Sequence, residues 1–275
     1  MPTDPDTLPT DPLKRLESIM AILRGPDGCP WDREQDHRTL RTYLLEETYE
    51  VLDLLDSPGE IDDEELVEEL GDLLLQVVFH AQIASERDAF DLDRVAQRIS
   101  SKLIYRHPHV FASTEVSGTG EVLRNWEKLK QAEGKESALD GVPVSLPALL
   151  RAHRILAKAD RSGFRWESGE DALAKVREEF GELEEAVTAI LDGDSSSIDE
   201  ITIEFGDLVM SLATLLLQFG IDPELAAREA TQRFEQRFRN MEKRADEDGV
   251  TMTDLDRDEL LERWEQARQP ESFPE

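Results

Sequence analysis

Apolar residues recur at helical spacing along most of the chain, and the segments between them are rich in Gly, Pro and acidic residues. In the first half this pattern predicts helices over residues 13–23, 39–56, 64–86 and 91–104. In the second half it predicts helices over residues 148–160, 171–191, 201–219 and 223–244. No run shows the alternation typical of a β-strand, so we predict an all-α fold of helical bundles.

The segment between the two halves differs in composition. Over residues 113–147 the chain turns to Gly, Ser and Pro, as in "SGTGE" and "DGVPVSLP", with one short helix predicted around residues 126–133. We therefore predict three parts. They are an N-terminal helical domain (residues 1–112), a linker with one short helix (residues 113–147) and a C-terminal helical domain (residues 148–275).

The two predicted domains repeat one another in the order of their elements. Each has a Trp after the first helix, an EExxE sequence in the second, an ExxD sequence in the third and two basic residues in the fourth. The matching positions are Trp31 and Trp166; Glu46, Glu47, Glu50 and Glu178, Glu179, Glu182; Glu69, Asp72 and Glu204, Asp207; and Lys102, Arg106 and Arg233, Arg237. This repetition indicates a tandem duplication.

Composition and charge limit the possible partners. The chain carries 62 acidic residues against 31 Lys and Arg, a formal net charge of -31. This charge repels nucleic acids and anionic membranes, so we expect neither as a partner, and a polyanionic substrate would need a cation. The single cysteine, Cys29, excludes an intrachain disulfide and fits a reducing compartment. With no leader-like pattern at the start and no apolar run of membrane-spanning length, we expect a cytoplasmic protein.

The acidic residues of the repeats occupy positions that helical periodicity assigns to a buried face. Glu47 and Glu50 continue a line that starts at Tyr43, and Glu69 and Asp72 share one face of the next helix. Carboxylates that converge inside a bundle repel one another and lose hydration unless a cation neutralises them. Because oxygen ligands favour hard ions, the pattern predicts Mg²⁺ or Mn²⁺.

Other patterns in the sequence are weaker indications of a site. An EExxE sequence alone is more often a solvated helix face, but its combination with ExxD in both repeats favours a metal site. Glu34 and His37 form a single ExxH sequence that we interpret as solvated, and we interpret His107 and His109 as part of a structural turn. Cys29 has no basic activator at a recognisable spacing and is interpreted as structural. The absence of a GxxxxGK[ST] sequence excludes a P-loop mechanism.

The sequences "EETYE" and "ELGD" in the first repeat, and "EEFGE" and "EFGD" in the second, resemble the signature of the MazG nucleoside triphosphate pyrophosphohydrolases. "GCPWD", "RHPHVF", "SALDGVP" and "GFRW" resemble further segments of the two-domain bacterial members. The resemblance implies an α-helical bundle, usually a homodimer, that uses Mg²⁺ to hydrolyse nucleoside triphosphates to a monophosphate and pyrophosphate. At Arg165 the chain departs from the family's more usual GFDW, which bears on substrate selectivity.

The resemblance also implies roles for single residues. The implied metal ligands are Glu47, Glu50, Glu69 and Asp72 in the first repeat, and Glu179, Glu182, Glu204 and Asp207 in the second. Glu46 and Glu178 would orient or deprotonate the attacking water. The basic residues expected to hold phosphates are Lys175, Arg233 and Arg237, with Lys102 and Arg106 at the matching positions of the first repeat. Trp166 and Trp264 either stack on the base or are core aromatics.

The two repeats differ in the residues that neighbour their acidic positions. Lys175 stands where the first repeat has Tyr43, and polar residues follow the second ExxD sequence: Ser211 and Thr214, against Gln76 and Phe79. These differences predict that the second repeat carries most of the activity. The alternative is a non-catalytic acidic helical dimer that binds a partner through vestigial sites. Mg²⁺-dependent release of pyrophosphate would distinguish the two.

Overall fold

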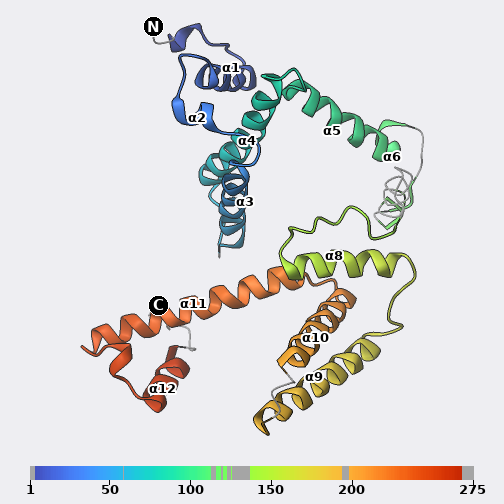
Figure 1. The fold of residues 1–275 in the computed structure, drawn as a ribbon, viewed down its shortest axis with the longest axis vertical. Coiled ribbons are helices and arrows are strands. Elements are labelled where there is room, and N and C mark those ends of the chain that lie inside the picture. Colours follow the sequence, from blue (N-terminus) through green and yellow to red (C-terminus); the bar gives the residue numbers. More distant parts are fainter. Residues whose placement is uncertain are drawn as a thin grey trace. The chain divides into compact units, whose positions relative to one another are not determined.

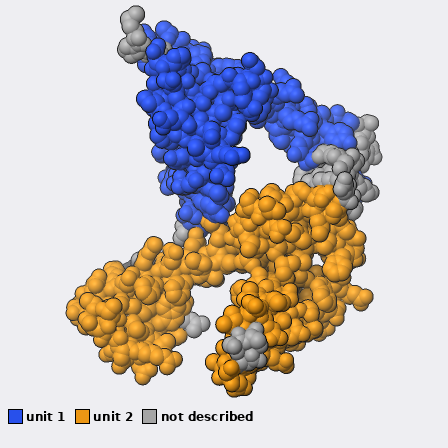
Figure 2. Space-filling view, in the orientation of Figure 1, with its two compact units in different colours: residues 1–133 blue, residues 134–275 orange. Residues whose placement is uncertain are grey.

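The computed structural model describes residues 4–57, 59–112, 116–118, 120–122, 125, 137–193 and 198–267. Over these residues the regular structure is helical and contains no strand, which confirms the all-α prediction. The chain divides into two compact units, residues 1–133 and 134–275 (Figure 2). This division falls inside the segment predicted to be a linker, and the helix predicted around residues 126–133 lies outside the described residues.

Unit 1 consists of a helical hairpin with shorter helices at one end (Figure 1). Its elements are η1 (Pro5–Thr7), α1 (Pro12–Arg24), α2 (Pro30–Glu34), α3 (Arg41–Asp56), α4 (Asp63–Ser85), α5 (Leu92–Arg106) and α6 (Pro108–Phe111). Helices α3 and α4 run side by side, and α1 packs against α4. The short helices α2 and α6 were not predicted, although each begins with a proline, a residue favoured in the first turn of a helix.

The core of unit 1 joins α1, α4 and the segment before α3. The buried cluster comprises Met20, Leu40, Val78, Phe79 and Ile83. Arg24 extends this packing, because its guanidinium lies over the Phe79 ring at 5.4 Å and binds both carboxylate oxygens of Glu86, at 2.6 and 2.8 Å. It also donates to the carbonyl oxygens of Asp32 and Gln35. One buried cation thereby fixes the segment that leads into α3 against α4.

The turn after α1 requires a glycine. A Cβ atom at Gly28 would lie 2.2 Å from the carbonyl oxygen of Leu23, and the N–H of Cys29 donates to that same oxygen at 2.8 Å. Only a residue without a side chain permits this approach. The turn sets the start of α2 and therefore the position of Trp31.

Unit 2 repeats this order of helices. Its elements are α8 (Ala148–Arg161), α9 (Gly169–Leu191), α10 (Ile198–Gln218), α11 (Pro223–Glu247), η3 (Met252–Asp254) and α12 (Arg257–Ala267). Helices α9 and α10 pack closely against one another, and α8 contacts α10 and α11. The small residues Ala172 of α9 and Ala213 of α10 are buried. The repeat extends to the helix caps, since Asp91 caps α5 and Asp222 caps α11 by accepting backbone N–H bonds.

Part of the predicted linker is fastened to α8. Lys158 is 9% exposed, and its Nζ donates to the carbonyl oxygens of Ala138 at 3.1 Å and Asp140 at 3.0 Å. A buried ammonium group needs such acceptors. The segment from Ser137 onward is therefore attached to unit 2. Within the described residues, none of the helices combines the length and apolar character that a membrane crossing requires.

Candidate metal centres and nucleotide site

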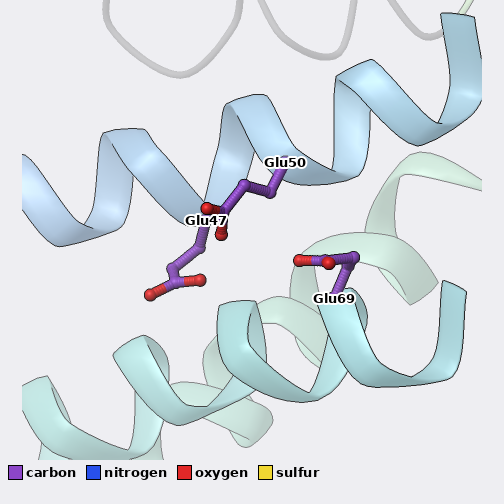
Figure 3. A group of neighbouring side chains, drawn as sticks. All are labelled: Glu47, Glu50 and Glu69. Carbon is purple, nitrogen blue, oxygen red and sulfur yellow. The ribbon is translucent and has the colours of Figure 1, made fainter. Parts of the chain in front are cut away.

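In unit 1 three of the predicted ligands converge between two helices. Glu47 and Glu50 project from α3 and Glu69 from α4 into the space between them (Figure 3). Each offers one carboxylate oxygen, and these oxygens all lie within 4.8 Å of one another. Asp72 is not in this group, but its charge is close enough to raise the pKa of Glu47 and of Glu69.

The electrostatics of this cluster favour a bound cation. Burial, the hydrogen bond with Glu50 and neighbouring negative charges raise the pKa of Glu47. Burial and the charges of Glu50 and Asp72 raise the pKa of Glu69. The ionised forms therefore repel one another, and a divalent ion held by carboxylate oxygens removes that repulsion.

In unit 2 the corresponding cluster consists of Glu179 from α9 with Glu204 and Asp207 from α10. Glu179 is 6% exposed, the most buried acid of either cluster. Glu182 stands outside the group, although burial and the charges of Glu179 and Glu204 raise its pKa. Oxygen ligands on two packed helices fit a hard ion, as the sequence predicted for both repeats.

A lysine distinguishes the unit 2 cluster. The Nζ of Lys175 lies 2.6 Å from Oε1 of Glu179 and 2.8 Å from Oε1 of Glu178. The hydrogen bond to Glu178 has the largest effect on the pKa of Lys175 and the bond to Glu179 the next largest. Both raise the pKa, so the amine remains charged. At the corresponding place in unit 1, Tyr43 packs edge to face on Trp31 with ring centroids 5.7 Å apart. Unit 1 therefore has an aromatic pair where unit 2 has a cation.

The polar residues that follow the two ExxD sequences differ in their hydrogen bonds. The hydroxyls of Ser211 and Thr214 donate to carbonyl oxygens of their own helix, at Leu208 (2.9 Å) and Met210 (2.8 Å). In unit 1, Gln76 is 5% exposed, its Nε2 lies 3.5 Å from Glu47 and its Oε1 has no hydrogen-bond partner. The buried amide of Gln76 thus borders the acid cluster of unit 1.

The remaining basic and aromatic candidates lie away from the acids of their own unit. Lys102 and Arg106 are near the far end of α5, which runs away from α3 and α4 (Figure 1). Arg237 lies over the ring of Trp264 at 4.6 Å, and Arg233 pairs with Glu229 at 3.4 Å. Helix α12, which carries Trp264, packs on the C-terminal half of α11, away from α9 and α10 (Figure 1).

Helix α12 was missed from the sequence although a signal was present. Asp256 accepts the backbone N–H of Glu259 at 2.9 Å, and the Glu259 carboxylate accepts the N–H of Asp256 at 2.9 Å. This reciprocal pair is a capping box with aspartate at the N-cap. The spacing of these two acids marks the start of the helix that positions Trp264.

Trp166 lines a pocket at one end of the α9–α10 pair. The pocket has a volume of about 200 Å³ and is bounded by the end of α8, the loop before α9 and the end of α10. A Cβ atom added to Gly169, at the start of α9, would lie 3.5 Å from the ring of Phe219, which follows α10. The loop before α9 therefore lies beside the end of α10. Trp166 is 39% exposed and therefore accessible to a ligand.

Two of the weaker patterns also have structural roles. The interpretation of His37 as solvated is wrong, because it is half-buried and its Nδ1 lies 2.9 Å from Nδ1 of His80. His107 Nδ1 lies 2.7 Å from the Leu103 carbonyl oxygen and its ring is near His109, at the junction of α5 and α6. Cys29 is a free, half-buried thiol before α2.

The fold and the two clusters define an all-α protein with a duplicated carboxylate centre suited to a divalent cation. Residues 35–111 match the family described as the MazG nucleotide pyrophosphohydrolase domain. The chain is 42% identical over 258 residues to the nucleoside triphosphate pyrophosphohydrolase/pyrophosphatase MazG of Thermotoga maritima, covering 93% of this chain and 95% of that protein. It is also 42% identical over 265 residues to the nucleoside triphosphate pyrophosphohydrolase of Escherichia coli, covering 94% and 98%. The chain belongs to the MazG family, as the sequence resemblance predicted.

Proposed function

We propose that the protein is a Mg²⁺-dependent nucleoside triphosphate pyrophosphohydrolase that converts its substrate to a nucleoside monophosphate and pyrophosphate. The observation that carries the proposal is the convergence of Glu179, Glu204 and Asp207 beside Lys175. Relatives that match nearly the whole chain bear the name of this activity. Mn²⁺ is an alternative ion for the same oxygen ligands.

The acidic residues would hold the ion. In unit 2 these are Glu179, Glu204 and Asp207, with Glu182 one turn further along α9; in unit 1 they are Glu47, Glu50 and Glu69, with Asp72 nearby. When bound, Mg²⁺ would neutralise phosphate oxygens and make the attacking water more acidic. By fixing the place of the ion, the carboxylates would determine where the reacting phosphate binds, and such positioning supplies most of the catalysis in phosphoryl transfer.

Glu178 and Glu46 are the proposed residues that orient or deprotonate the water which attacks the α phosphorus. Glu178 is bound to Lys175, so its carboxylate is fixed next to Glu179. Glu46 is exposed beside Glu47. Proton transfer by a positioned carboxylate is a standard role in hydrolysis.

Cations would hold the phosphates, and aromatic rings would hold the base. Lys175 already lies at the acid cluster, where it can exchange one carboxylate for a phosphate oxygen. Arg233, Arg237 and Trp264 lie on a separate part of unit 2, and Lys102 and Arg106 lie on α5 of unit 1. Their proposed roles in substrate binding therefore need an acid cluster other than that of their own unit, which a second chain would supply. Trp166 faces the pocket next to the cluster.

We also propose a homodimer. Helix α4 exposes an apolar stripe of Val67, Leu70, Leu74 and Val77, and the second repeat exposes Phe205 and Leu212 at positions matching Leu70 and Val77. A two-helix layer cannot bury such a face by itself, and contiguous exposed apolar patches mark interaction sites. Two hairpins packed face to face would form a four-helix bundle. We place the protein in the cytoplasm, without nucleic acid or membrane partners, because of its free cysteine and its charge.

The products test this proposal. Purified protein with a nucleoside triphosphate and Mg²⁺ should release pyrophosphate and the monophosphate, and a chelator should abolish the release. In ¹⁸O-labelled water the label should appear in the monophosphate, because water attacks the α phosphorus. Release of orthophosphate and a diphosphate would contradict the proposal, and an absence of turnover would favour the non-catalytic alternative.

A further inference from the structure

The pocket beside Trp166 has a specific combination of walls. One side is apolar, formed by Leu156 of α8 and Leu217 of α10, and Trp166 adds an aromatic face. A wider polar recess of about 780 Å³ shares Asp160, Arg165 and Gln218 with it. An aromatic face with polar groups at its edge suits a flat heterocycle, because the ring stacks and its edge forms hydrogen bonds.

The pocket lies at the correct distance from the acid cluster to receive the base of a bound nucleotide. Thr214 lines the pocket and follows Asp207 by seven residues, so the two lie on the same face of α10, about 10 Å apart along the axis. Lys175 lies on α9, between Trp166 and Glu179 in the sequence, and contacts the Glu179 carboxylate. The α phosphate, which reacts, is the phosphate nearest the ribose and base, so a base in the pocket would direct the α phosphate toward the acid cluster and Lys175 and let the β and γ phosphates extend beyond it.

The polar groups of the pocket have free hydrogen-bonding capacity. Within the described ranges, neither the Asp160 carboxylate nor the Arg165 guanidinium has a side-chain hydrogen bond or ion pair. Asp160 is half-buried at the end of α8, and Arg165 is exposed beside Trp166. An acceptor-only group and a donor-only group thus border the same recess.

From this arrangement we infer that the unit 2 pocket selects guanine, with Asp160 accepting from the N1–H and 2-amino groups and Arg165 donating to O6 and N7. Guanine is the common base with two adjacent donors on one edge and two adjacent acceptors on another. Adenine would place its unprotonated N1 against the Asp160 carboxylate, and uracil and cytosine lack the second donor and the N7 acceptor. Trp166 and the leucines would hold the purine ring without discriminating between bases.

This inference rests on the proposed pyrophosphohydrolase activity and specifies its substrate. The rates of pyrophosphate release from GTP, ITP, 7-deaza-GTP, ATP, CTP and UTP should be compared at equal Mg²⁺. ITP lacks the 2-amino group, and 7-deaza-GTP lacks N7, so each analogue tests one proposed contact. We expect kcat/KM for GTP to exceed that for ATP, CTP and UTP by roughly ten- to a hundredfold.

Two substitutions assign the contacts. Asp160→Asn should reduce the GTP:ITP ratio of kcat/KM to about one, and Arg165→Ala should do the same to the ratio of GTP to 7-deaza-GTP. Asp192→Asn, which removes an exposed acid at the opposite end of α9, is the matched control and should leave both ratios unchanged. Calorimetric titration with GMP and IMP supplies a readout without turnover, in which Asp160→Asn should weaken GMP binding more than IMP binding, because IMP keeps the N1–H but lacks the 2-amino group.

The outcomes distinguish a failure of the proposed function from a failure of the guanine inference. If no triphosphate is hydrolysed, the proposed function fails. If all are hydrolysed at similar rates, or another base is preferred, the function stands and the guanine inference is wrong. Because ratios are measured within one variant, a partly unfolded Asp160→Asn preparation still reports discrimination, and Arg165, being exposed, can be replaced without loss of packing.

Discussion

The ammonium of Lys175 lies 2.6 Å from the Glu179 carboxylate, four residues further along α9. It binds Glu178 as well, so one cation partly neutralises the cluster that contains Glu179, the most buried acid of the two clusters. The equivalent carboxylate of unit 1, Glu47, has as its neighbour the amide of Gln76, which carries no charge. The two centres therefore have acidic residues at the same sequence positions but differ in the positive charge available to a triphosphate.

Replacing Lys175 with alanine should reduce activity chiefly through substrate binding. Because the substitution removes a charged donor to the phosphates, we expect kcat/KM to fall roughly tenfold or more, mostly as a higher KM. Steady-state kinetics with varied triphosphate measures the effect. Lys243→Ala on the exposed face of α11 is the control, and an equal loss in both variants would show that general charge, and not the site, is responsible.

Binding of Mg²⁺ should stabilise the folded protein. The ion relieves the repulsion within each cluster, and any ligand that binds only the folded state raises Tm. We expect Tm to increase with Mg²⁺ concentration beyond the change that Na⁺ of equal ionic strength causes. The double substitution Glu179→Gln with Asp207→Asn should reduce the increase. Superimposable melting curves with Mg²⁺ and with a chelator would remove the case for a bound ion.

Protonation of His80 should destabilise unit 1 in mild acid. Burial and then the charge of His37 lower the pKa of His80, so its neutral form is favoured in the folded state. Its contribution to stability is present above the unfolded pKa, about 6.5, and is lost as pH falls toward the lower folded value. The ring centroids are 5.2 Å apart and the Nδ1 atoms 2.9 Å, which means that the nitrogens point at one another and can share only one proton.

Urea unfolding of the wild type and of His80→Gln between pH 8 and 5.5 measures this effect. We expect the variant, which cannot titrate at this position, to lose less stability on acidification. His109→Gln, at the junction of α5 and α6, should retain the wild-type pH dependence. Parallel curves for wild type and His80→Gln would assign the acid sensitivity to other groups.

The sequence was sufficient to predict those features of the structure that depend on local helical periodicity. The spacing of Glu47 and Glu50 in α3, and of Glu69 in α4, placed these acids on facing surfaces, and the structure brings them together. The contact of His37 with His80 was not predictable, because it joins residues 43 positions apart through packing. The attachment of residues 138 and 140 to Lys158 depends in the same way on the path of the chain.

Disrupting the apolar stripe of α4 should dissociate the proposed dimer. Leu70 is 47% exposed and lies on this stripe, so Leu70→Asp would place a charge in the interface at little cost to the isolated chain. Light scattering coupled to size exclusion should show the mass of a single chain for this variant. Leu13→Asp, at a residue 52% exposed on α1, is the matched control and should remain dimeric. A wild-type protein that runs as a monomer would refute the dimer directly.

The final prediction is that unit 2 carries most of the turnover. Glu179→Gln removes the most buried acid and the partner of Lys175, so we expect pyrophosphate release to fall at least about a hundredfold, the scale of losing a principal electrostatic contact in an active site. Glu47→Gln makes the same chemical change in unit 1, where Tyr43 replaces the lysine, and should leave most of the activity. Circular dichroism and Tm measured on both variants would show that each remains folded, so that the comparison concerns the sites alone. Equal losses would mean that the two centres contribute equally, and that the positive charge of Lys175 does not decide which one acts on the triphosphate.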